Sequence, residues 1–135
     1  MNIEEKLKSL HDLFSIFDDR KDQFLQLIDM AKESSSLSEK EKIDKNRIYG
    51  CTSQAWIIST KNNDDTYNFQ TDSDSLIVKG LLAILEDIFN GQNVKEICSF
   101  DSNIILKKIG LNTIISSQRT NGFSNAVEKV KKLIQ

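Results

Sequence analysis

A cysteine in a turn-forming segment is the first residue of this chain that could do chemistry. Cys51 stands between Gly50, which permits a sharp or positive-φ backbone, and Thr52-Ser53, which continue a turn. A thiol acts as a nucleophile in its thiolate form, which a helix N-terminus or a nearby cation favours. The start of a predicted helix at residues 73–75 and Arg119 are the two candidates for that role. The alternative is that Cys51 is a small, half-buried hydrophobe, as free cysteines usually are.

Other residues suited to nucleophilic or metal chemistry are scarce, because the chain contains two cysteines and one histidine. Cys98 follows the apolar Val94 and Ile97 in a predicted short helix, which is typical of a structural thiol. His11 would make a Cys/His hydrolase only if tertiary contact placed it beside Cys51. These three residues cannot complete a four-ligand Cys/His zinc site. The sequence also has no glycine-rich phosphate loop, HExxH motif or Walker pattern.

Several charged and aromatic residues favour binding or packing over catalysis. Arg119 is one of three arginines, and its planar guanidinium is suited to hold Asp74 or an acidic group of a partner, the alternative being a surface cation. Asp72 and Asp74 are interpreted as charges that suit the N-terminal dipole of the following helix. Trp56 is interpreted as a core residue of a strand. With its apolar neighbours it is expected to form a pocket that leaves Cys51 less exposed than reactive thiols usually are.

Composition limits the classes of function. A chain of 135 residues with 39% hydrophobic and 28% charged residues is expected to fold, and to form a single domain. A net charge of -2 provides no field that would attract nucleic acid. No stretch approaches the roughly 18 apolar residues of a membrane span, and the N-terminus is too charged for a secretory signal. A cytoplasmic protein without membrane or nucleic-acid partners is therefore expected.

Hydrophobic periodicity predicts the elements of the first half of the chain. Apolar residues at steps of three and four predict a helix over 3–17 and a second helix that ends near Glu33, the two forming a hairpin. Residues 34–45 have no clear period and are interpreted as an exposed connector. Strand-forming residues on both sides of a turn predict a β-hairpin over 53–60 and 66–71.

The second half of the chain is predicted to be helical. Residues 75–89 are apolar on almost every side, which predicts a central buried helix, and Gly80 within it indicates the close approach of another backbone. Short helices follow, one of them capped by Asp101 and ended by Gly110. A final amphipathic helix reaches the C-terminus. Two helices, a small sheet and further helices define the α+β class.

Three blocks of sequence carry a more specific pattern when they are taken together. They are GCTSQAWI at 50–57, DSDSLIVKGL at 72–81, and SQRTNGF at 117–123, which contains an Arg-x-x-Gly motif. The chain resembles the SufE family of sulfur acceptors in these blocks, and the likeness runs from about Asp19 to Lys132. The resemblance implies a single SufE-like domain over residues 1–135 with the two-layer fold of the SufE and IscU families. That fold has an N-terminal helical hairpin, a small antiparallel sheet with the cysteine loop, a central buried helix and C-terminal helices.

The resemblance also implies a function. Cys51 would accept persulfide sulfur from a PLP-dependent cysteine desulfurase of the SufS type, stimulate that enzyme, and pass sulfur to Fe–S cluster assembly on a SufBCD-type scaffold complex. The chain would then be a sulfur-transfer protein without a metal or cofactor, not a stand-alone enzyme. Asp74 and Arg119 hold family-typical positions that would support the cysteine loop or meet the desulfurase. Still open are a CsdA-like desulfurase as the partner, a homodimer, an interaction module without chemistry, and an IscU-like Fe–S scaffold, which would need three cysteine ligands.

Overall fold

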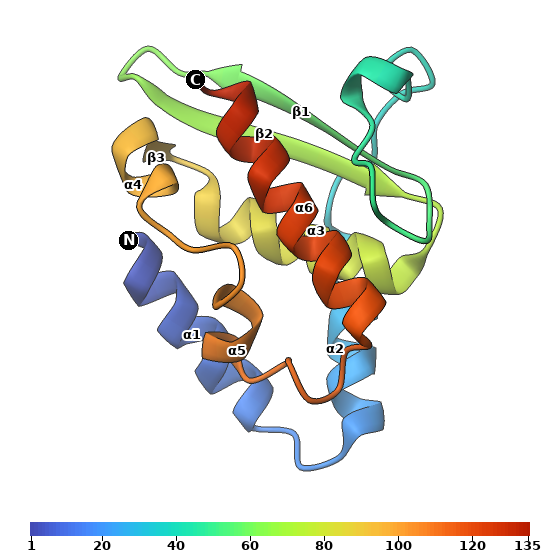
Figure 1. Ribbon diagram of the computed structural model, residues 1–135. Coiled ribbons are helices and arrows are strands. Elements are labelled where there is room, and N and C mark those ends of the chain that lie inside the picture. The colour runs from blue at the N-terminus through green and yellow to red at the C-terminus, as the bar shows by residue number, and fades with distance from the viewer.

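A computed structural model describes all 135 residues of the chain (Figure 1). It is an α+β fold in which helices pack beneath a three-stranded antiparallel sheet with strand order β1-β2-β3, so the predicted class is confirmed. In chain order the elements are α1 (Ile3–Ser15), α2 (Arg20–Glu33), the 3-10 turn η1 (Asp44–Asn46), β1 (Ala55–Lys61), β2 (Thr66–Ser73), α3 (Leu76–Phe89), β3 (Gln92–Asn93), α4 (Val94–Cys98), α5 (Ile105–Ile109) and α6 (Ser117–Leu133). No helix has the length and apolar character that a membrane crossing requires.

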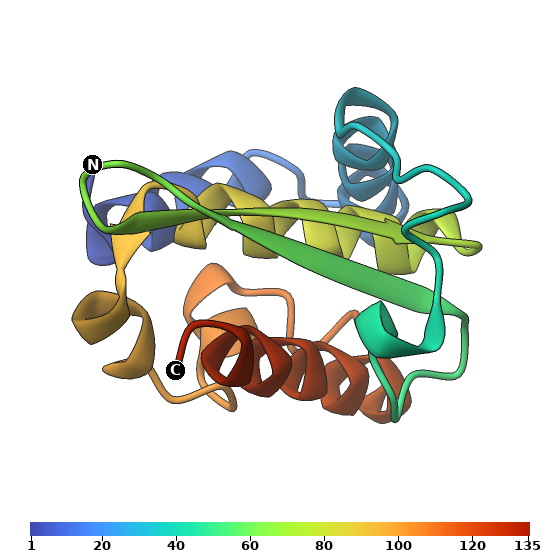
Figure 2. The same cartoon turned by 90° about the horizontal axis from the view of Figure 1, so that it is seen from above.

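The central helix α3 joins the layers of the fold. It begins after Ser75, whose hydroxyl accepts a hydrogen bond from the backbone N–H of Val78 and caps the helix. Because it is apolar around most of its circumference, it packs against α2, β2 and α6 at once (Figure 2). Seven of its side chains belong to the core cluster of 27 buried residues. The prediction of a central buried helix is confirmed.

The β-hairpin places two parts of the chain beside each other at one end of the sheet. The predicted hairpin is confirmed, and its register runs from Ala55 opposite Ser73 to Lys61 opposite Tyr67. The segment that enters β1 therefore lies next to the segment that leaves β2 and begins α3. Strand β3 was not predicted, because two residues are too short to show an alternating pattern.

The two N-terminal helices are present as predicted, but they diverge from the short turn that joins them (Figure 1). Helix α2 packs on α3, while α1 packs on α5 and α3. A Cβ at Gly80 in α3 would collide with the backbone carbonyl of Leu27 in α2. The predicted close approach at Gly80 is thus confirmed. The segment that approaches is α2, which packs on α3 and not on α1.

The connector after α2 is less exposed than the sequence suggested. Leu37 is 6% exposed, and its backbone N–H donates to Asp72 Oδ2 at 3.1 Å. Asp72 is itself buried, accepts a second bond from the N–H of Ser73, and lies 3.3 Å from the ammonium group of Lys42. The interpretation of Asp72 as a helix-dipole charge is therefore wrong: this carboxylate fastens the connector to the end of β2.

The short helix α5 differs from its prediction at one end only. Gly110 ends it in the left-handed conformation with φ 91°, as predicted. Asp101 does not cap it, because the carboxylate accepts from the backbone N–H of Asn103 in a separate turn and α5 begins at Ile105 without a side-chain cap. The predicted cap is wrong.

Candidate functional site

Hydrogen bonds anchor the loop that carries Cys51 at both of its ends. We define the Cys51 loop as residues 49–53. On one side the N–H of Ile48 donates to the carbonyl of Ala55 at 2.8 Å. On the other side Gln54 and Asp74 exchange two bonds: the Asp74 N–H donates to the Gln54 carbonyl at 3.2 Å, and the Gln54 N–H donates to Asp74 Oδ1 at 3.1 Å. The register of the β-hairpin brings these anchor residues together.

Between its anchors the Cys51 loop is held by a single hydrogen bond. The Cys51 thiol donates to the carbonyl oxygen of Gly122 in α6 at an Sγ to O distance of 3.7 Å. Tyr49 and Gly50 form a turn within the loop, and the thiol makes the one hydrogen bond from the loop to another element. Gly50 has φ +87°, a conformation that glycine adopts readily, and it lies against the side chain of Asn125. Packing of the thiol, rather than a hydrogen-bonded framework, therefore holds the loop in this position.

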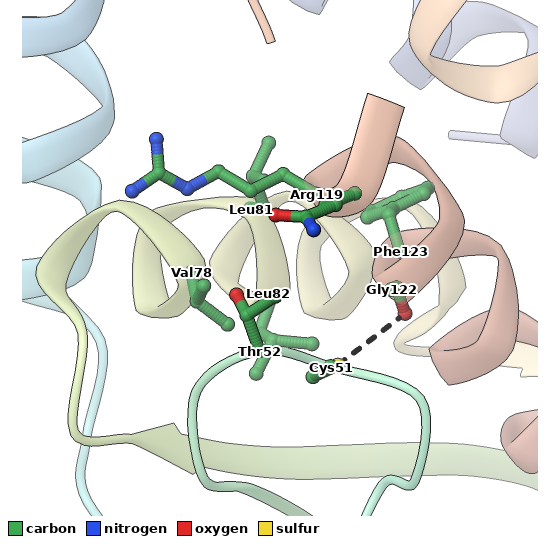
Figure 3. Close-up of a pocket in the computed structure, with 9 residues that line it drawn as sticks. Cys51, Thr52, Val78, Leu81, Leu82, Arg119, Gly122 and Phe123 are labelled. Carbon is green, nitrogen blue, oxygen red and sulfur yellow. Dashed lines mark hydrogen bonds between the residues drawn. The ribbon is translucent and has the colours of Figure 1, made fainter. Parts of the chain in front are cut away.

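The thiol lies in a small, largely apolar pocket between α3 and α6 (Figure 3). The residues that line it are Cys51, Thr52, Val78, Leu81, Leu82, Gln118, Arg119, Gly122 and Phe123. The loop approaches α6 so closely that a Cβ on Gly122 would lie 3.0 Å from Cys51 Sγ and 3.6 Å from Cys51 Cα. Glycine at this position of the helix is what lets the cysteine reach its pocket.

Burial raises the pKa of the Cys51 thiol above its ordinary value. Neither group expected to favour the thiolate counters this effect. The Arg119 guanidinium forms no hydrogen bond or ion pair and extends along α3, away from the sulfur (Figure 3). The hydroxyl cap at the start of α3 is directed to Val78. Cys51 is therefore a neutral thiol at pH 7 in this structure, and activation requires a change in its surroundings.

The structure separates residues that the sequence suggested would meet. Asp74 and Arg119 form no ion pair: Asp74 anchors the loop at Gln54, while Arg119 lines the pocket. Trp56 does not line the pocket either, so the expectation that it would is wrong. Its ring lies in a separate polar hollow, with the Lys42 ammonium 5.6 Å from the ring centroid. The expected partial burial of Cys51 is confirmed, but the residues that cover the thiol come from α3 and α6.

Cys98 and His11 both lie away from the pocket. Cys98, at the end of α4, packs against the core and accepts a hydrogen bond from Gln135 Nε2 at 3.9 Å, in keeping with a structural thiol. His11 is exposed on α1 and is 3.6 Å from the carboxylate of Asp12. The Cys51–His11 contact that a Cys/His hydrolase would need is absent. No group of three or more His, Cys, Asp or Glu side chains is placed to hold a metal ion.

Sequence reasoning assigned the apolar walls of the pocket to the general core. Val78, Leu81, Leu82 and Phe123 are indeed buried, and nothing in their helical spacing marks them as neighbours of a reactive thiol. The one signal in the sequence was Gly122, a glycine inside an amphipathic helix where alanine would be more favourable. Such a residue indicates close approach, but it does not say which segment approaches.

The chain matches the family model for SufE, described as an Fe–S metabolism associated domain, over residues 8–134. A SufE-like protein of Rhizobium etli is 33% identical over 93% of this chain and 87% of the relative. A protein of Wigglesworthia glossinidia brevipalpis named cysteine desulfuration protein SufE is 31% identical over 88% of this chain and 83% of the relative. These matches show that the chain belongs to the SufE family, which supports a sulfur-acceptor role in Fe–S metabolism and implies a cysteine desulfurase as partner.

A solved structure has the same fold. The solution structure of a hypothetical protein from Thermus thermophilus superposes with a TM-score of 0.78 over 96% of this chain and 93% of that chain. The two sequences share 14% identity, so this likeness concerns the fold alone.

Proposed function

We propose that Cys51 accepts sulfane sulfur from the active-site persulfide of a PLP-dependent, SufS-like cysteine desulfurase, and that the chain stimulates this enzyme and passes the sulfur to a SufBCD-type scaffold complex. Family membership and the placement of Cys51 on a lightly held loop support the proposal. The observation that carries it is the contrast between firm anchors at both ends of the loop and one thiol hydrogen bond within it. The chain acts as a carrier, and the desulfurase performs the catalysis.

The transfer is a thiol exchange. Cys51 loses its proton, and the thiolate attacks the outer sulfur of the donor persulfide. A bond forms between Cys51 Sγ and that sulfur, the sulfur–sulfur bond of the donor breaks, and the donor cysteine leaves with the electron pair and takes up a proton. No net oxidation occurs, so the step needs no other reactant.

The raised pKa of Cys51 makes the loop position part of this mechanism. In the pocket the thiol is neutral and a weak nucleophile, whereas outside it the desolvation that raises its pKa is removed. Binding of the desulfurase draws the loop out of the pocket. This movement brings the Cys51 sulfur to the donor and at the same time returns the pKa of the Cys51 thiol to its ordinary value. A free chain is thereby kept from reacting with other electrophiles.

Asp74 and Arg119 support the transfer in different ways. Asp74 keeps Gln54 in place, so the loop moves about a fixed end. Arg119 has a half-buried side chain with no partner for its guanidinium, and at the mouth of the pocket it is placed to bind an acidic group of the desulfurase. Arg119→Lys is expected to raise the desulfurase concentration needed for half-maximal loading, because the bidentate geometry is lost.

The test is intact-mass spectrometry after incubation with a cysteine desulfurase, PLP and cysteine. We expect the wild type and Cys98→Ser to gain one sulfur atom that reductant removes, and Cys51→Ser to gain none. An unmodified wild type beside a desulfurase shown to be active would contradict the carrier mechanism. A gain that survives in Cys51→Ser and disappears in Cys98→Ser would show that Cys98, and not Cys51, accepts the sulfur.

A further inference from the structure

A second hollow lies beside the Cys51 loop, further along α6 than the pocket that holds the thiol. Its volume is about 440 Å³. The segment that enters and begins the loop contributes Arg47 and Tyr49 to this hollow. Helix α6 contributes Asn125, Lys129 and Lys132, whose spacing of three and four residues places them on one face of the helix. The loop and α6 therefore form this surface together.

Four cations gather here without carboxylate partners. Arg47, Lys129 and Lys132 line the hollow. Lys45 adjoins it, because its backbone carbonyl accepts a hydrogen bond from Lys129 Nζ at 2.9 Å. None of the four side chains forms an ion pair. Glu128, the one carboxylate of the hollow, is already paired with a lysine of the same helix. Positive charge is thus in excess beside the loop, although the whole chain has a net charge of -2.

An exposed aromatic side chain lies among these cations. Tyr49 is 62% exposed, and the guanidinium carbon of Arg47 is 5.6 Å from the centroid of its ring. Tyrosine and arginine are enriched at protein–protein interfaces, where an aromatic ring in contact with a partner contributes much of the binding energy. Tyr49 also belongs to the Cys51 loop, two residues before the thiol. A partner that binds this ring therefore acts directly on the loop.

We infer that Lys45, Arg47, Tyr49, Lys129 and Lys132 form a docking surface for an acidic segment of the cysteine desulfurase. We call these five residues the Tyr49 surface. The inference rests on the proposed function and adds how the sulfur donor is recognised: carboxylates of the donor pair with the four cations, and its apolar atoms cover the tyrosine ring. Opposite charges on two proteins steer their encounter and raise the association rate constant.

Nucleic acid is the other polyanion that four cations attract. Two observations favour the desulfurase. The Tyr49 surface includes part of the loop whose thiol must reach the donor sulfur. In addition, Arg47 is shared with the neighbouring polar hollow, which is also lined by the carboxylates of Glu39, Asp44 and Asp74. These carboxylates would repel a phosphate backbone that ran past the Tyr49 surface, whereas an acidic protein segment can end before it reaches them.

The test is biolayer interferometry with an immobilised SufS-like desulfurase of the same organism. All chains in solution carry Cys51→Ser, so that binding is measured without sulfur transfer. In this parent, Lys45→Glu/Lys132→Glu reverses two charges whose side chains form no hydrogen bond or ion pair, and the fold should be retained, as judged by circular dichroism. We expect the association rate constant at low salt to fall at least about tenfold and to become less sensitive to added salt.

A matched control separates the Tyr49 surface from the net charge of the chain. Lys8→Glu/Lys21→Glu changes the net charge by the same amount at exposed positions of α1 and α2. We expect this control to associate within about twofold of the parent, because rate changes of this kind come from charges at the rim of the interface.

Tyr49→Ala tests the aromatic contact. We expect the dissociation rate constant to rise about fivefold or more and the association rate constant to change little, because loss of a covered aromatic ring acts mainly on dissociation. Ile16→Ala, at another exposed apolar position, is the control and should dissociate like the parent. Equal dissociation of the two variants would remove Tyr49 from the surface.

Other results would overturn the inference as a whole. They are a parent that does not bind the desulfurase, association that Lys45→Glu/Lys132→Glu leaves unchanged, and equal losses in that variant and in the lysine control. Tighter binding of the parent to a labelled single-stranded RNA than to the desulfurase would assign the surface to nucleic acid instead. Failure of sulfur loading in the wild type, with the charge-dependent binding intact, would contradict the proposed function alone.

Discussion

Two glycines inside helices bring other segments of the chain into close contact, but those segments are held very differently. At Gly80, α3 meets the backbone of α2 at Leu27, and α2 is a regular helix of 14 residues. At Gly122, α6 meets Cys51, whose loop has one hydrogen bond of its own. Close packing on a helix glycine therefore occurs both at a junction between two regular helices and at one where a loop is held by packing and a single thiol hydrogen bond.

The surroundings of the two contacts account for the difference. Beside Gly80, the buried ammonium group of Lys79 donates to the carbonyls of Thr71 and Ser35 and to the hydroxyl of Ser34, and it lies 3.5 Å from the carboxylate of Glu86. This network ties α2, β2 and α3 together. Beside Gly122 there are apolar walls and a neutral thiol. A network of directional polar contacts fixes the first junction, whereas packing and the single thiol hydrogen bond to Gly122 close the second.

Removal of the buried cation should have the largest effect. Lys79→Ala removes the cation paired with the Glu86 carboxylate, whose side chain is 13% exposed and which then keeps only the hydroxyl groups of Ser34 and Thr71 as donors. We expect the free energy of unfolding, measured with urea, to fall by about 3–5 kcal/mol, because the remaining charge is buried and unpaired. Lys132→Ala, at an exposed position of α6, is the control and should change little. A similar loss in both variants would mean that the network does not fix this junction.

Substitution of the two glycines by alanine should have different effects on the free energy of unfolding. Gly80→Ala should lower the free energy of unfolding by about 1–3 kcal/mol, because the backbone of α2 cannot give way. Gly122→Ala should leave it unchanged or raise it by up to about 1 kcal/mol, because alanine favours a helix and the Cys51 loop can move aside. Urea unfolding of the two variants gives the comparison.

The reactivity of Cys51 gives a second way to compare Gly122→Ala with Gly80→Ala. In Gly122→Ala the displaced thiol should react faster with iodoacetamide at pH 7 than in the wild type, since the burial that raises its pKa is reduced. In Gly80→Ala the rate in the native state should stay unchanged. A loss of stability in Gly122→Ala without faster alkylation would show that the loop is as firmly held as α2.

Asp72 extends the comparison to a second segment that is held by polar contacts. Burial acts to raise the pKa of Asp72, but hydrogen bonds from the N–H groups of Leu37 and Ser73 and from Lys42 outweigh it and lower the pKa. Asp72→Asn keeps an acceptor and loses the charge, so we expect a loss of about 1 kcal/mol at pH 7. The lowered pKa means that this contribution is complete above about pH 3.9 and is lost at lower pH. The measurement is urea unfolding of the wild type and of Asp72→Asn at pH values above and below about 3.9.

An exposed carboxylate provides the control for Asp72. Asp29→Asn changes an exposed position of α2 and should alter stability little at either pH. A difference between wild type and Asp72→Asn that persists undiminished well below pH 3.9 would mean that the charge of Asp72 does not fasten the connector.

The smallest expected effect is a contribution of Cys51 to stability at alkaline pH. Its pKa is raised in the folded chain, so above about pH 8.5 the unfolded chain loses the thiol proton first and the free energy of unfolding declines. This decline should be shallower in Cys51→Ser than in the wild type, when both are followed by urea unfolding from pH 7 to 10. Identical slopes in the two proteins would contradict burial of the Cys51 thiol.

Local patterns predicted the elements of this fold better than its contacts. The periodicity of α1, α2 and α3 and the turn between β1 and β2 are local properties, so the sequence revealed them. The divergence of α1 and α2, and the burial of Leu37 under an aspartate 35 positions away, depend on tertiary contacts that no local pattern encodes. Two-residue β3 is also defined only by its partner strand.

The candidate site shows the same division. Its central residue, Cys51, was identified from a turn-forming context and a family resemblance. The environment of Cys51 could not be identified in this way, because the residues that line the pocket look like any other core positions until α3 and α6 pack together. The raised pKa of the thiol follows from that packing and reverses the activation that a cation or helix N-terminus would have given.

The anchors of the Cys51 loop also set how far the sulfur can travel. The loop of residues 49–53 is tethered at Ile48 and at Gln54, so Cys51 is at most three residues from either fixed point. Fully extended, three residues span about 10 Å. In the proposed transfer, the donor sulfur must therefore come within about 10 Å of these two fixed points, plus the length of the cysteine side chain. A more deeply recessed sulfur would be out of reach, so the depth of the partner's cleft becomes a geometric criterion for recognising it.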